Sequence, residues 1–196
     1  EITHVIRGDD HLSNTPRQIL LFEALGWKPP QYAHLPLIVG SDGTPLSKRH
    51  GSVALSAFKG KGFLPEALLN FLVLLGWGAP GNQEIFSLAQ MIELFSLKRI
   101  NKANAQFNLE KLEWLNAQYL KKLSDVDYID RISAFYAEER KAFSSDQWRE
   151  LCLLYKGRIK TFSEFKTQAS YCFQELPPYD LAKKSELAKE PNLRQH

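Results

Sequence analysis

Two short polar clusters in this sequence combine residue types that could bind a charged substrate. The first is the loop at residues 41–52, which carries Ser47, the adjacent cations Lys48 and Arg49, and two glycines. Glycine lets a backbone approach a ligand closely, and Lys and Arg supply charge and N–H donors that suit phosphate. These residue types favour a polyphosphate-binding loop. An ordinary solvated basic loop is the alternative, and the neighbouring elements decide between the two.

The second cluster, residues 7–11, reads Arg-Gly-Asp-Asp-His and follows the strand-like run at residues 2–6. The loop at 41–52 likewise follows an apolar run, residues 35–39. In an open α/β sheet, ligands bind outside the carboxyl ends of the strands. We therefore expect both clusters to converge on one crevice.

A helix is expected between these two strands. Thr15 and Gln18 form a capping-box pair around Pro16, and Gly26 follows the apolar positions as a stop signal. The segment is thus predicted to be one βαβ unit. One such unit cannot cover both faces of a parallel sheet, so its partners are expected in a part of the protein that precedes this sequence.

After the loop the pattern predicts helices. Residues 64–75, opened by Pro65, are apolar on nearly all sides and predict a central buried helix. Two stripes of apolar and aromatic residues near the C-terminus are typical of a core rather than of a base-stacking surface. Helix starts are predicted at Ser87 with Gln90 as a capping box, at Asn108, at Ser124, at Ser144, and at Thr161 with Glu164 as a capping box.

The composition is that of a globular chain that does not cross a membrane. The sequence has 196 residues and a formal net charge of +3, which is too small to argue for nucleic-acid binding. No apolar run reaches the ~20 residues that a membrane helix needs. Cys152 and Cys172 fall in amphipathic helical patterns, as buried thiols of a reducing compartment do. We expect a cytoplasmic protein, or one from an organelle with its own translation.

Five segments in unbroken order resemble a known family. They read THVIRGDDHL, TPRQILLFEALGW, YAHLPLIVGSDGTPLSKRHG, LPEALLNFLVLLGW and NLEKLEWLNAQYL. Together they are similar to the glutamyl-tRNA synthetases, within the class I aminoacyl-tRNA synthetases. The likeness covers roughly the first two thirds of the chain and is weak after about Leu123.

This resemblance implies a mainly α fold with a small α/β part. Residues 1–55 would be the C-terminal piece of a class I Rossmann-like catalytic domain. Residues 56–122 would be a stem-contact helical domain, and residues 123–196 the beginning of an α-helical anticodon-binding bundle. The family's His-Ile-Gly-His signature does not occur in the 196 residues. The chain is therefore expected to be a fragment that lacks the N-terminal half of the catalytic domain and is inactive alone.

The resemblance also assigns the basic loop. The family's lysine-rich signature, Lys-Met-Ser-Lys-Ser or Lys-Leu-Ser-Lys-Arg, is matched by Pro45, Leu46, Ser47, Lys48 and Arg49. The first lysine is replaced by Pro45, which has neither its charge nor a backbone N–H. Lys48 is therefore expected to be the catalytic residue at the phosphates of ATP, with Ser47 and Arg49 also binding ATP.

Further positions are carried over to the amino acid and to the adenine. Arg7 matches the arginine that faces the side-chain carboxylate of glutamate, with Asp10 and His11 lining the same pocket. Leu37 and Ile38 match the strand end whose backbone meets the adenine. For these two residues, membership of a buried strand is an equally good interpretation of the sequence.

The implied activity is glutamate–tRNA ligation. Glutamate would be activated by ATP with Mg²⁺ and transferred to the 3′-terminal ribose of tRNA(Glu) by a monomer. No structural metal is expected, because His4, His11, His34 and His50 lack the short spacings of zinc sites. Three alternatives stay open: a glutaminyl-tRNA synthetase, a glutamyl-queuosine relative, and a non-catalytic module that binds tRNA or a protein partner.

Overall fold

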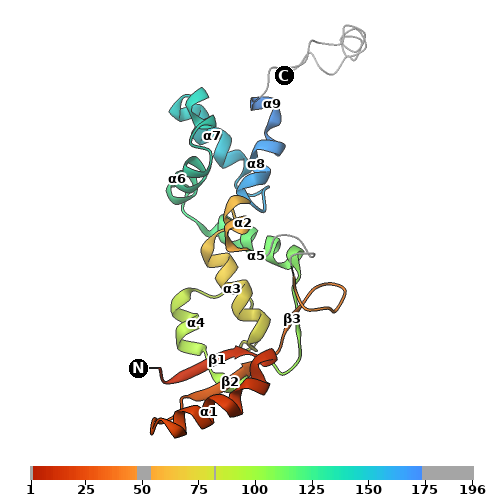
Figure 1. Cartoon of the computed structure of the whole chain (residues 1–196). Helices are drawn as coiled ribbons and strands as arrows, with labels where there is room; N and C mark the ends of the chain where they lie inside the picture. The colour runs from red at the N-terminus through yellow and green to blue at the C-terminus, as the bar shows by residue number, and fades with distance from the viewer. Residues whose placement is uncertain (1, 48–53, 82, 174–196) are drawn as a thin grey trace, which may run out of the picture.

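The structure is a computed structural model that describes residues 2–47, 54–81 and 83–173. The chain is elongated, with a small βαβ unit at one end, helices α3 to α5 in the middle and helices α6 to α9 at the other end (Figure 1). The described residues are mostly helical with few strands, so the expectation of a mainly α fold with a small α/β part is confirmed at this level.

The βαβ unit forms as predicted at the N-terminal end. Strand β1 (His4–Gly8) leads through the 3-10 helix η1 (Asp9–Asn14) into helix α1 (Thr15–Ala24), and strand β2 (Gln31–Leu35) returns parallel to β1. In this pairing Arg7 lies opposite His34. The chain turns out of α1 at Gly26, whose φ of 70° is in the left-handed region that glycine tolerates.

The apolar run at residues 35–39 is not one strand, so that prediction was wrong. Strand β2 ends at Leu35, and strand β3 (Ile38–Val39) belongs to a separate two-stranded sheet with β4 (Ala105–Gln106). Pro36 lies between the two strands. Because proline has no N–H to donate, it cannot sit inside a hydrogen-bonded ladder. The basic loop therefore leaves a different sheet from the one that carries Arg7.

The helical part follows the predicted order. Its helices are α2 (Leu55–Gly60), α3 (Pro65–Gly76), α4 (Leu88–Leu94), η3 (Leu97–Arg99), α5 (Leu109–Lys122), α6 (Asp125–Phe135), η4 (Glu139–Ala142), α7 (Ser145–Tyr155), α8 (Phe162–Gln168) and α9 (Ser170–Phe173). The side chains of Ser87, Asn108, Ser124 and Ser144 cap helices as predicted, and those of Ser87 and Ser144 form complete capping boxes.

The capping box expected at Thr161 is absent. Its hydroxyl lies 3.1 Å from that of Ser163, and its side chain makes no capping bond to the described backbone. The Glu164 carboxylate instead accepts the Lys160 N–H at 2.8 Å, one residue earlier than a capping box requires.

Helix α3 is less buried than its composition predicts. Ala67, Asn70 and Phe71 are buried, but Leu69 and Leu72 are each 41% exposed. These two leucines line an open apolar groove of about 1110 Å³ between α2, α3 and α6. The residue pattern predicted the apolar character of the helix correctly but not how many of its sides are covered.

Two main apolar cores hold the helices together. The middle core gathers Phe58, Phe63, Phe71, Leu112 and Leu115 from α2, α3, α5 and the turn before α3. The C-terminal core contains both predicted stripes, in which Trp148, Leu151, Tyr155, Ile159, Phe162, Phe165 and Ala169 are buried. It also takes in Leu64, Ala67 and Leu120, so the C-terminal helices pack directly on α3 and α5.

Both cysteines are free thiols, as expected. Cys152 is fully buried in the C-terminal core, whereas Cys172 is partly exposed. Burial raises the pKa of the Cys152 thiol to about 12.

Candidate functional site

The site begins at Arg7, near the carboxyl end of β1. Its Nη2 donates to Thr15 Oγ1 at 2.9 Å and to Gln18 Oε1 at 2.8 Å, and it lies 3.4 Å from the His11 carbonyl oxygen. Nε donates to His34 Nε2 at 3.4 Å. These partners come from β2, η1 and α1. The side chain is thus clamped between the small sheet and the start of the helix.

The clamp uses the two residues that the sequence pattern assigns to a capping box. Helix α1 begins after Asn14, whose side chain makes no capping bond to the described backbone. Thr15 and Gln18 turn toward Arg7 instead, and Thr15 is buried. A tertiary partner has therefore replaced the local one. Thr15 and Gln18 are site residues that sequence reasoning missed, although their polar spacing on one face of a helix was the available signal.

His34 and Tyr32 form the strand side of the clamp. The Thr15 hydroxyl lies 3.1 Å from His34 Nε2, the same nitrogen that receives the Arg7 Nε–H. Accepting at Nε2 requires that this nitrogen carries no proton. The rings of Tyr32 and His34 are near parallel, and the Arg7 guanidinium lies 5.5 Å from the centre of the Tyr32 ring. Both aromatic residues were also missed, because only the strand register reveals them.

Asp10 and His11 lie in η1 beside the clamp and are exposed. His11 Nε2 is 3.7 Å from an Asp10 carboxylate oxygen. His11 reaches Arg7 through its backbone carbonyl rather than through its ring. The structure therefore brings Arg7, Asp10 and His11 together, as the sequence predicts.

The first half of the basic loop is a tight turn built on β3. Leu46 N–H donates to the Ile38 carbonyl at 2.8 Å, and Gly40 N–H donates to the Thr44 carbonyl at 2.8 Å. The Asp42 carboxylate accepts from the Thr44 N–H and hydroxyl, at 3.0 and 2.7 Å. Gly43 has a φ of 74°, which this turn needs and which other residues adopt with strain.

Pro45 pairs with Val39 as an isolated antiparallel bridge. Because proline donates no N–H, it fits this bridge without leaving a donor unpaired. Leu46 and Ser47 are partly buried. Lys48 and Arg49, the expected phosphate ligands, lie outside the described residues.

Leu37 and Ile38 sit where the loop meets the second sheet. The Leu37 carbonyl accepts the Ala105 N–H at 3.2 Å, and the Ile38 carbonyl accepts the Leu46 N–H. Both carbonyls therefore already have a protein partner. Ile38 is partly exposed, while Val39 after it is buried.

Gly8, at the end of β1, lies near the residues that lead into the basic loop: a Cβ placed on it would lie 3.9 Å from the Leu37 side chain. The cleft and the groove found among the described residues lie elsewhere, between α2, α3, α6 and α8. The second half of the basic loop lies outside the described residues, so the single crevice stays a prediction.

Two kinds of feature do not occur in the part of the chain that the structure describes. Within these ranges, no group of three or more His, Cys, Asp or Glu residues is arranged to hold a metal ion. Nor does any described helix combine the length and apolar character that a membrane span requires.

Comparisons with known proteins show which family this chain resembles. The family model described as tRNA synthetases class I (E and Q), catalytic domain, matches residues 1–114. The chain is 47% identical over 180 residues to a glutamate–tRNA ligase of Nitrosospira multiformis. It is 44% identical over 185 residues to one from a Synechococcus strain. These matches cover 90% and 92% of this chain and 38% of each relative.

The comparison with solved structures points to the same family. The crystal structure of a glutamate tRNA ligase from Elizabethkingia meningosepticum in complex with its amino acid matches with a TM-score of 0.80 and 32% identity. The match covers 98% of this chain and 42% of that one. The chain therefore spans about two fifths of the length of these relatives. From the extent of the family match and the shared fold, the chain belongs to the class I tRNA synthetase family for glutamate and glutamine.

Proposed function

We propose that the whole protein carrying this sequence is a glutamate–tRNA ligase. The carboxylate of glutamate attacks the α-phosphorus of MgATP, the bond to pyrophosphate breaks, and glutamyl-adenylate forms. The terminal ribose hydroxyl of tRNA(Glu) then attacks the activated carbonyl and AMP leaves. Support comes from the two relatives named above. Both are glutamate–tRNA ligases, and their matches cover 90% and 92% of this chain.

The observation that carries the substrate assignment is that Arg7 has no carboxylate partner among the described residues. Its partners among residues 2–47, 54–81 and 83–173 are a hydroxyl, an amide oxygen, a carbonyl oxygen and an imidazole nitrogen. None of these is a carboxylate. A guanidinium that is held in place by neutral acceptors keeps its full attraction for an anionic ligand. The side-chain carboxylate of glutamate fits this position, and the neutral amide of glutamine is a poorer partner.

The remaining roles rest on the resemblance. Lys48 is proposed to stabilise the charge that builds on the phosphate oxygens in the transition state, with Ser47 and Arg49 beside it. The backbone at Leu37 and Ile38 is proposed to meet the adenine, and Asp10 and His11 to line the amino-acid pocket. The domain division at residues 55 and 122, and action as a cytoplasmic monomer, belong to the same proposal.

The alternatives differ in the fold of the chain after the loop. The glutaminyl enzymes continue into β-barrels, whereas the described residues from 54 onward are mainly helical. This continuation favours the glutamyl assignment. A glutamyl-queuosine relative would lack the long helical extension, and α6 to α9 extend the chain well beyond the catalytic match at residue 114.

The test uses the full-length protein with tRNA, ATP and either glutamate or glutamine. We expect attachment of glutamate and, with tRNA present, glutamate-dependent exchange of pyrophosphate into ATP. Arg7→Ala should lower kcat/KM for glutamate by ~10² or more, because it removes one partner of a hydrogen-bonded charge pair. Arg17, exposed on α1, gives the matched control, and Arg17→Ala should leave kcat/KM for glutamate unchanged.

Lys48→Ala tests the loop in the same protein. It should lower the activation rate by ~10² to 10³, as loss of one preorganised donor does. The melting temperature should stay nearly constant. A variant that melts early but keeps the parent's activation rate would show that Lys48 is structural. Failure of the parent protein to charge tRNA with glutamate would overturn the proposed function itself.

A further inference from the structure

The middle and C-terminal parts of the molecule meet at a set of directional hydrogen bonds. The turn at residues 61–64, between α2 and α3, faces the segment at residues 160–163, which begins α8. Phe162 N–H donates to the Gly62 carbonyl at 3.3 Å, and Ser163 N–H donates to the Lys61 carbonyl at 3.2 Å. We call these two segments, with Asn116 between them, the joint.

Asn116 is the side chain that closes the joint. It lies on α5 and is fully buried. Its Oδ1 accepts the Leu64 N–H at 2.8 Å, and its Nδ2 donates to the Lys160 carbonyl. One amide thus ties α5 to both segments of the joint. Without it, the Leu64 N–H would lose its partner in a buried position, and the Lys160 carbonyl would lose the donor that ties it to α5.

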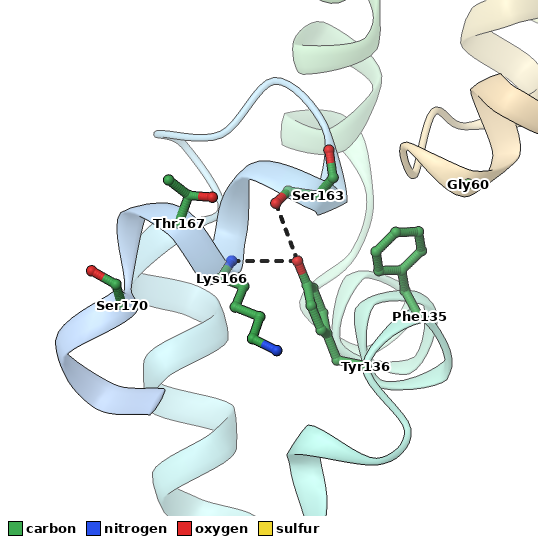
Figure 2. Close-up of a pocket in the computed structure, with 7 residues that line it drawn as sticks. All are labelled: Gly60, Phe135, Tyr136, Ser163, Lys166, Thr167 and Ser170. Carbon is green, nitrogen blue, oxygen red and sulfur yellow. Dashed lines mark hydrogen bonds between the residues drawn. The ribbon is translucent and has the colours of Figure 1, made fainter. Parts of the chain in front are cut away.

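The two sides of the joint are in very close contact. Gly62 has a φ of 74°, and a Cβ at this position would collide with the Phe162 side chain and lie 2.9 Å from the Phe162 nitrogen. Tyr136 directly follows α6 and holds the start of α8, because its hydroxyl donates to the Phe162 carbonyl at 2.7 Å. Figure 2 shows this hydroxyl bonded to the start of α8, beside a cleft of about 490 Å³ that Gly60 also lines.

Apolar packing alone would not define this geometry. The C-terminal core passes through the joint by way of Leu64, Ala67 and Leu120, and apolar contacts are non-directional. Hydrogen bonds depend on angle, so they fix the rotation of one part against the other. In Figure 1, α2 and α5 lie between helices α6 to α9 and the βαβ unit, and β1, which carries Arg7, is at the far end of the molecule.

We propose that Asn116 is a positioning residue that sets the orientation of α6 to α9 relative to the βαβ unit, and thereby the alignment of a bound tRNA. This inference rests on the proposed function, which supplies the RNA. A tRNA that presents its terminal ribose at the βαβ end and also contacts the C-terminal helices spans the joint, so a change in the joint angle misplaces one contact or the other. Glutamate and ATP bind on one side of the joint and do not feel this change.

Asn70 provides a matched control. It is also a fully buried asparagine, on α3. Its Oδ1 accepts from Phe86 N–H at 2.7 Å and from the Tyr119 hydroxyl at 2.8 Å, and its Nδ2 donates to the Glu84 carbonyl at 2.8 Å. All of these partners lie within the middle part of the molecule. Asn70→Ala therefore removes a comparable buried network without touching the joint.

The experiment measures steady-state glutamylation by full-length parent, Asn116→Ala and Asn70→Ala proteins beside their melting curves. Both variants should melt earlier than the parent. Asn116→Ala should raise KM for tRNA by ~10-fold while KM for glutamate and for ATP stay within about twofold of the parent, the pattern expected when one substrate alone loses binding. Asn70→Ala should leave all three KM values near those of the parent.

Equal KM values for tRNA in the two variants would overturn the inference, because the effect would then be one of stability alone. If Asn116→Ala does not fold, Asn116→Asp decides in its place, since it keeps an oxygen that accepts the Leu64 N–H but loses the N–H that donates to the Lys160 carbonyl. An unchanged KM for tRNA in that variant would also refute the role. If the parent protein transfers no glutamate, the proposed function fails separately. Titration of labelled tRNA against parent and Asn116→Ala protein then tests the joint, and equal affinities would refute it.

Discussion

Two tyrosines on α6 and at its end should respond in opposite directions to loss of the hydroxyl. Tyr128 and Tyr136 are both buried in the C-terminal core. The Tyr128 hydroxyl has no hydrogen-bond partner within the part of the chain that the structure describes. The Tyr136 hydroxyl donates to the Phe162 carbonyl at 2.7 Å and accepts from the Lys166 N–H at 3.3 Å. Burial raises the pKa of both phenols, so each is protonated at neutral pH.

The expected magnitudes depend on the groups that each hydroxyl leaves behind. A hydroxyl buried without a partner costs roughly 1–3 kcal/mol in proteins, so Tyr128→Phe should stabilise the folded state by ~1 kcal/mol. Tyr136→Phe removes two hydrogen bonds between a buried side chain and the backbone of α8. That loss should destabilise the folded state by about 1–3 kcal/mol. The two variants remove the same atom, and their free energies of unfolding should differ by ~2–4 kcal/mol.

Native-state hydrogen exchange of the full-length protein measures this difference locally. Peptides from α6, α7 and α8 report the free energy of opening of the C-terminal core, without requiring that the whole molecule unfold in one step. Amides in these peptides should exchange more slowly in Tyr128→Phe and faster in Tyr136→Phe. If Tyr128→Phe accelerated exchange as much as Tyr136→Phe, its hydroxyl would have a partner and the reasoning would be wrong.

Two other predictions concern the region where the middle helices meet α6 and α8. Gly62→Ala should destabilise the protein by more than ~2 kcal/mol, because a left-handed φ and a collision with Phe162 add together. Gly26→Ala has a similar φ of 70° but no described atom within 4 Å of the new Cβ, so it should cost only about 1 kcal/mol in the same thermal denaturation series. The hydrogen bond from Arg131, on α6, lowers the pKa of Glu66, on α3, below its ordinary value of 4.5. This pair should therefore stabilise the fold above about pH 4.5 and lose its effect as the pH falls through the lowered pKa. Because both side chains are half exposed, the difference between parent and Glu66→Gln should stay below ~1 kcal/mol at pH 7 and vanish in acid, and equal differences at pH 7 and pH 3 would contradict it.

Helix starts show how far the sequence determines local structure. Ser87 forms the predicted capping box, and Ser144 forms one where the sequence predicts a helix start, because in each case both partners lie within one turn and no other described group competes for them. Thr15 has the same local pattern, with Gln18 three residues later. Yet a guanidinium on the preceding strand takes both side chains. A cap can be read from four residues, but a competing tertiary partner cannot.

The strands show the same limit of local sequence patterns. Hydrophobic character marked residues 35–39 as one strand, but strand membership depends on which chain lies alongside. Ile38 pairs with Ala105, more than sixty residues later, and no local pattern carries that information. Pro36 was the available sign that the run is broken. The prediction that the polar clusters at residues 7–11 and 41–52 follow strands of a single sheet was therefore wrong.

Arg7 combines a local pattern with tertiary partners that the pattern does not reveal. The sequence alone offered a charged residue after a strand, which is common on protein surfaces. The structure adds what makes this one unusual: among the described residues, its hydrogen-bond acceptors are a hydroxyl, an amide oxygen, a carbonyl oxygen and an imidazole nitrogen, and none is a carboxylate. A structural arginine in such a place would ordinarily gain a carboxylate, because a charge-assisted pair is stronger than a bond to a neutral acceptor. Asp9 and Asp10 lie only two and three residues away, yet the described structure pairs neither of them with Arg7. Neutral partners fix the direction of the charge without cancelling it, and this is the arrangement that recognition of an anionic substrate requires.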